Sequence, residues 1–134
     1  MIDYELQVFN ICAEALEREL PGVVLTNRIT IGMPSEFPSC CIAESNNAVA
    51  DEYIDSSGIE QAARVTYGVD IFSNKRVGAK QEAKAIFQVV DHVLYSLNLT
   101  RRFVDSYTYE DGTIYRIVAS YEGIFDVDGN LYRR

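Results

Sequence analysis

The chain has 134 residues, 48% of them hydrophobic and 24% charged, which is the balance of an ordinary soluble globular protein. At this length we expect one α+β domain covering residues 1–134, with a core that buries roughly two thirds of the unfolded surface. No apolar run approaches the ~20 residues of a membrane span, and the first residues show no signal peptide, so the sequence predicts a cytosolic protein.

The net charge of −8 is unevenly distributed along the chain. Residues 1–60 carry two basic against eleven acidic side chains, or −9, whereas residues 61–134 carry ten against nine, or +1. The acidic first part argues against nucleic-acid binding, since affinity for phosphates depends on Lys and Arg. It agrees with simple solubility, and equally with an acidic face of one copy meeting a basic face of another. Composition leaves both interpretations open.

The first half of the chain predicts a helix followed by short strands. Residues 3–20 form the helix, because apolar residues recur at helical spacing, and Pro21-Gly22 ends it. Residues 23–33 offer one or two β-segments, and residues 39–45 a strand. Residues 46–61 predict a long polar loop, for which a hairpin is one option, and a loop of this length commonly has a function. The expected buried stripe of the helix is Val8, Ile11, Cys12, Ala15 and Leu16.

The second half predicts a strand, a helix and two more long strands. Residues 63–72 alternate between apolar and polar, as do residues 101–109 and 113–125, and residues 79–97 show helical periodicity. Residues 131–134 add a short last strand. Because the late connections have hairpin length, the sequence predicts a mostly antiparallel sheet with two main helices packed on one face. The buried stripe expected for the second helix is Ala83, Ile86, Phe87, Val90, Leu94 and Leu97.

Residues 70–84 pass from a strand through a basic, glycine-containing turn into a helix, which is the order of a phosphate-binding loop. A Walker A loop needs GxxxxGK[ST], and here no Ser or Thr follows Lys80 and no glycine stands at the required distance before Gly78. The turn is instead a basic surface, because Lys75, Arg76, Lys80 and Lys84 crowd the start of the helix. It is either a solvated face or a contact for the acidic groups of a partner protein.

Catalytic and metal-binding patterns are absent from the sequence. The three cysteines have no CxxC spacing, and His92 is the only histidine. Residues 126–130 place a glycine too early for a calcium loop and indicate a β-turn. We therefore expect no catalytic, cofactor-binding or metal-binding residue and no enzyme. The alternative is a cellular enzyme or small-ligand-binding module with a pocket near Cys40, Cys41 and His92.

With these features in place, the chain resembles a family of small proteins from tailed phages and prophages of Gram-positive bacteria, the tail-completion, tail-terminator or head–tail joining proteins. The resemblance runs along nearly the whole chain, with no catalytic motif in it. It rests on the first helix and on "FPSCCIAES", "SSGIEQAARVTYGVDIFSNKRVGAKQEAKAI", "LTRRFVDS", "TIYRIVASYEG" and "GNLYRR".

The resemblance implies a non-enzymatic virion protein with no cofactor. It would form a ring, commonly a hexamer, that caps the tail tube and joins it to the head connector, with DNA passing through. Its partners would be other copies of itself, the major tail-tube protein and the connector, in the virion or, during assembly, in the host cytoplasm. A head-side connector or stopper protein is the alternative within this class. From the charge pattern, the interface residues expected are Lys75, Arg76, Lys80, Asp51, Glu52 and Asp55.

Overall fold

A computed structural model of the chain describes residues 4–27, 34, 36–49, 62–109, 113–126 and 131–132. In these ranges two helices and six strands form an α+β fold, as the sequence predicts. The elements in chain order are α1 (Glu5–Glu19), β1 (Val24–Thr26), β2 (Ser39–Val49), β3 (Ala62–Ser73), α2 (Ala79–Ser96), β4 (Thr100–Tyr109), β5 (Ile114–Asp126) and β6 (Leu131–Tyr132).

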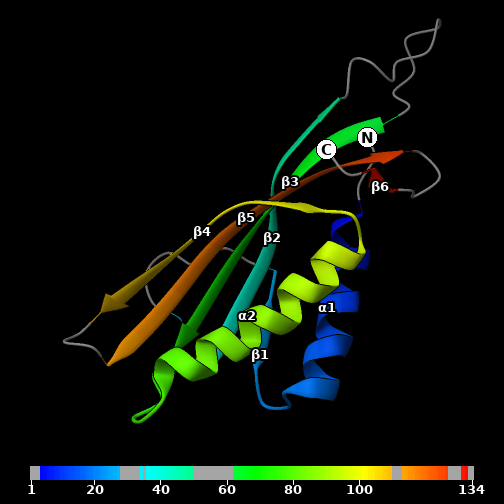
Figure 1. The fold of residues 1–134 in the computed structure, drawn as a ribbon. Helices are drawn as coiled ribbons and strands as arrows, with labels where there is room; N and C mark the ends of the chain where they lie inside the picture. Colours follow the sequence, from blue (N-terminus) through cyan, green and yellow to red (C-terminus); the bar gives the residue numbers. More distant parts are fainter. Residues whose placement is uncertain are drawn as a thin grey trace, which may run out of the picture.

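The strands form one sheet in the order β1-β2-β3-β5-β4 (Figure 1). Only the short β1–β2 pair is parallel, and the other pairs are antiparallel. The strand β5 therefore lies between β3 and β4, which places β4 at an edge of the sheet. The strand β6 pairs with the far end of β5, beyond the reach of β4.

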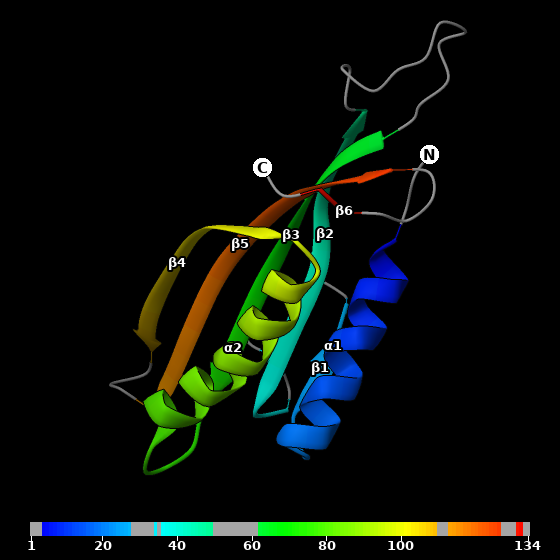
Figure 2. The same ribbon diagram turned by 45° about the vertical axis from the view of Figure 1, so that its right-hand side comes forward.

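Both helices cover the same face of the sheet, antiparallel to each other (Figure 2). Side chains at alternate positions of β3 and β5 point to this face and pack against the helices, as their period of two predicts. The core beneath α2 includes Ile86, Val90 and Leu94 from the helix and Tyr67 and Tyr121 from the sheet, all fully or almost fully buried. We call the opposite, helix-free side of the sheet the open face.

Two expectations about the first half are wrong in detail. Ile11 is 42% exposed, because the core side of α1 is narrower than the sequence stripe and consists of Val8, Cys12, Ala15 and Leu16. Residues 46–49 belong to β2 rather than to a loop. They pair antiparallel with β3 after a bulge between Glu44 and Asn46, which agrees with the hairpin option. Residues 50–61 lie outside the described residues.

Local backbone chemistry explains where α2 begins and ends. Gly78 precedes the first turn with a φ of 91°, a left-handed conformation that glycine adopts without strain, so this glycine allows the turn. Asn98 follows the helix with a φ of 66°, the conformation that Asn tolerates better than most residues. The chain then enters β4 at Thr100.

Candidate assembly surface

The edge strand β4 is exposed on both of its faces. Phe103 and Tyr107 point to the open face and are 49% and 46% exposed, and Val104 points to the helix side and is 42% exposed. No helix in the described part of the chain covers β4 (Figure 1). A ten-residue edge strand with apolar side chains on both faces is a template for contact with another protein.

On the open face, one arginine organises the aromatic residues beside β4. The Arg116 guanidinium donates from Nε and Nη2 to the two oxygens of Asp70, at 2.7 and 2.9 Å, and from Nη1 to the Tyr109 hydroxyl at 2.9 Å. The same group lies 5.1 Å from the centre of the Phe72 ring and 6.0 Å from that of Tyr107. The bond to Asp70 raises the pKa of Arg116 further above its already high value. This network gives the open face a fixed, partly apolar surface.

On the helix side, a groove of about 700 Å³ separates α2 from β4. Its walls include Lys80, Lys84 and Phe87 from α2 and Val104 from β4, and Tyr115 and Ile117 of β5 also line it. The groove therefore combines apolar side chains with positive charge at the beginning of α2. No ion pair joins Lys80 or Lys84 to another residue that the structure describes.

A second network holds the two walls of this groove together. Arg101 of β4 donates to Asp91 of α2 at 3.2 Å and lies 5.8 Å from the centre of the Phe87 ring. The Tyr121 hydroxyl also donates to Asp91, and burial, followed by this bond, raises the pKa of Tyr121. The negative charge of Asp91 is thus offset inside the protein, which leaves the lysine end of the groove positive.

The predicted interface residues are divided between the described and undescribed parts of the chain. Lys75, Arg76 and Lys80 are exposed around the turn before α2, and Val77 between them is 83% exposed. Of these, Lys80 lines the groove beside β4. The acidic members of the prediction, Asp51, Glu52 and Asp55, lie outside the described residues.

The basic turn lies at one end of β3. The turn follows Ser73, the last residue of the strand, whereas residues 50–61 precede Ala62, its first. A strand of 12 residues is about 40 Å long. The basic turn is therefore about 40 Å from the other end of this strand.

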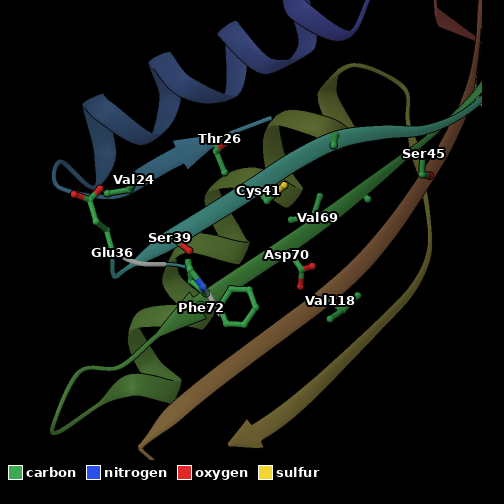
Figure 3. A pocket seen from close by; sticks show the side chains of 13 residues that line it. Val24, Thr26, Glu36, Ser39, Cys41, Ser45, Val69, Asp70, Phe72 and Val118 are labelled. Atoms are coloured by element: carbon green, nitrogen blue, oxygen red, sulfur yellow. The ribbon is translucent and has the colours of Figure 1, made fainter. Parts of the chain in front are cut away.

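The alternative pocket of Cys40, Cys41 and His92 does not come together. Cys40 is buried under the helices, whereas Cys41 points to the open face and lines a depression there with Asp70, Phe72 and Val118 (Figure 3). His92 lines a different depression, between the outer sides of α1 and α2. Neither cysteine is placed to form a pair with the histidine. Among the described residues no group of three or more His, Cys, Asp or Glu could hold a metal ion.

The electrostatics of the thiols are also opposite to those of a nucleophile, which needs a lowered pKa. Burial raises the pKa of Cys12 to about 12 and raises that of Cys40 well above its ordinary value. For Cys41, burial and then the charge of Asp70 raise the pKa. The buried cysteines therefore act as packed, protonated side chains.

This burial predicts a loss of stability at alkaline pH. The unfolded state releases the Cys12 proton near pH 9.0 and the folded state only near 12, so the thiol stabilises the fold fully below pH 9 and progressively less above it. We expect its contribution to fall by about 1.4 kcal/mol per pH unit above 9. Urea unfolding at pH 8, 10 and 11 should show a steeper decline for the wild type than for Cys12→Ala. Equal slopes would contradict the assignment.

Comparison with solved structures shows a likeness of fold to a virion protein. The fold is similar to that of a chain in the virion of a native gene transfer agent particle. The TM-score is 0.58, and the match covers 88% of this chain and 92% of that chain. The sequences are 15% identical, so the likeness is one of fold. No family model matches the chain, and no curated protein matches it.

The sequence predicts the basic turn but not the surface around β4. Residues 101–109 show the alternation of a strand with one buried face, and only the pairing of β5 with both β3 and β4 reveals that β4 is an edge. The sequence did contain one signal for an exposed edge strand, because it predicts no third amphipathic helix that could cover such an edge. No helix in the described ranges is long and apolar enough to cross a membrane.

Proposed function

We propose that this chain is a non-enzymatic structural protein of a phage-like virion, of the tail-terminator or tail-completion type. It assembles as a ring, caps the tail tube and connects it to the head connector. The observation that supports this most strongly is the likeness to a virion chain over nine tenths of both lengths. The open edge strand, with the groove on its helix side, supplies a contact surface that such a subunit needs.

Ring assembly requires two different surfaces that meet head to tail. The fold offers distinct lateral edges, since α1 lies toward the β1 end of the sheet and β4 is uncovered at the other (Figure 2). It also offers an end marked by charge, because the exposed basic turn follows Ser73, the last residue of β3. The lateral edges suit contacts between copies, and the ends suit contacts with the tail tube and the connector.

Inactivation of the gene in a producing strain tests this function. A missing cap should leave heads and tails unjoined and the tail tube free to continue growing, which electron microscopy of the lysate would show. Normal joined particles would refute the proposal. Joined tails on heads that have lost their DNA would instead favour a head-side stopper.

The basic turn carries a separate prediction. Lys75→Glu with Arg76→Glu should weaken binding to the partner virion protein by about tenfold, because both side chains are exposed and a reversal introduces repulsion. Co-sedimentation of the purified chain with tail tubes would measure this. The control is Gln81→Glu, which adds an exposed negative charge in the first turn of α2 rather than in the basic turn. Unchanged binding of the double variant would remove the turn from the interface.

A further inference from the structure

We propose that the groove between α2 and β4 is filled by helix α1 of a neighbouring copy of this chain, an inference that rests on the proposed ring. The two helices leave β4 uncovered, so the helix layer ends one helix short of the edge of the sheet (Figure 2). The helix α1 lies at the other side of that layer. A contact between α1 of one copy and the groove of the next is therefore heterologous and repeats around a ring.

The outward flank of α1 has the chemistry to fill this groove. Ala15, Arg18 and Glu19 lie beside α2 and identify the inward flank. At 100° per residue, Leu6, Phe9 and Ala13 fall on the opposite flank. Leu6 is 60% exposed, Phe9 is half-buried, and neither belongs to the hydrophobic core. An apolar stripe at i, i+3 and i+7 is what a helix presents to a partner.

The charges of the two surfaces are complementary. Glu14 and Glu17 are exposed on α1. No ion pair joins either of them to a residue in the described ranges. The groove presents Lys80 and Lys84, and no ion pair joins either lysine to another residue that the structure describes. Of its other charges, Arg101 and Asp91 pair with each other, while Asp105 of β4 adds a negative charge to the lining. The two acidic side chains of α1 can therefore meet the two lysines of α2.

The register of the two surfaces also agrees. The end of α1 and the start of α2 lie at the same end of the fold, because Glu19 and Leu20 line one depression together with Lys75 and Gly78. In a ring whose axis runs along the strands, rotation keeps this end level in every copy. Glu14 and Glu17 of one copy then lie level with the lysine end of the next groove. The apolar residues Leu6 and Phe9 lie level with its farther part, toward Arg101 and Asp91.

Charge reversal tests this pairing with full-length protein. Lys80→Glu with Lys84→Glu, and separately Glu14→Lys with Glu17→Lys, should each weaken assembly by at least about tenfold, because each places like charges in contact. The fourfold variant has the wild-type net charge of −8, and it should assemble again because every pair is restored with its sign exchanged. The measurement is the oligomer mass by light scattering, alone and with tail-tube protein. All changes are on exposed side chains, and circular dichroism confirms folding.

A second pair of variants separates the two faces of β4. Val104 faces the groove, so Val104→Asp should abolish the oligomer. Phe103 is the adjacent residue on the opposite face, so Phe103→Asp should leave the oligomer intact. If the wild type assembles and both double variants do too, the α1 contact is wrong while the proposed function stands. The contact is also overturned if the fourfold variant does not recover assembly. It is overturned as well if assembly is lost in Phe103→Asp but not in Val104→Asp. A wild type that never assembles refutes the ring itself.

Discussion

Replacing Leu94 by alanine should lower the free energy of unfolding by about 2–5 kcal/mol, the largest effect that we expect from a single substitution. Leu94 is fully buried on α2 and belongs to the core cluster between the helices and the sheet. Alanine removes the transfer free energy of the side chain and leaves a cavity that packed neighbours fill only in part. Urea unfolding followed by circular dichroism measures the change.

The matched control is Leu6→Ala, the same substitution on the exposed flank of α1. Leu6 is 60% exposed, so its loss should change the free energy of unfolding by less than about 0.5 kcal/mol. The same variant should weaken assembly, because we place this side chain in the groove of the next copy. A loss of stability equal to that of Leu94→Ala would mean that the faces of the helices are wrongly assigned.

Replacing Asp70 by alanine should lower the free energy of unfolding by about 1–3 kcal/mol. Asp70 accepts two hydrogen bonds from Arg116, and both side chains are only about 30% exposed, at 31% and 29%. Without the carboxylate, the guanidinium remains at the centre of the open face with Tyr109 as its partner. The Phe72 and Tyr107 rings then lose the group that holds them together. Thermal unfolding and near-ultraviolet circular dichroism report both changes.

The corresponding control is Glu19→Ala, which breaks the pair between Arg18 and Glu19. Those side chains are 69% and 58% exposed and 3.7 Å apart, so solvent screens the pair and its loss should be within about 0.5 kcal/mol. If Asp70→Ala were as mild as this control, the Arg116 network would not organise the open face.

The parts of the fold that could be predicted are those that depend on local periodicity. Strands β3 and β5 alternate so regularly that their core-facing residues, such as Tyr67 and Tyr121, follow from sequence alone. The same holds for α2, whose apolar stripe is strong and whose ends at Gly78 and Asn98 have recognisable backbone chemistry. These signals exist because one face of each element is buried and the other is not.

What could not be predicted depends on contacts between distant parts of the chain. Asp70 and Arg116 are separated by 46 positions, and nothing in either segment marks the other as its partner. Ile11 fits the helical stripe, yet the sheet and α2 leave it exposed. The groove exists because β5 inserts between β3 and β4 and no third helix covers that edge in the described chain. The candidate surface is thus a product of topology.

The mass of the wild-type protein in solution, measured by light scattering with and without tail-tube and connector proteins, tests the central claim most directly. We predict a single closed oligomer, six times the 15.1 kDa of the chain for the hexamer expected from the resemblance. Its appearance should depend on Lys80, Lys84 and Val104. A mass of 15.1 kDa at every concentration and in every mixture would contradict the account.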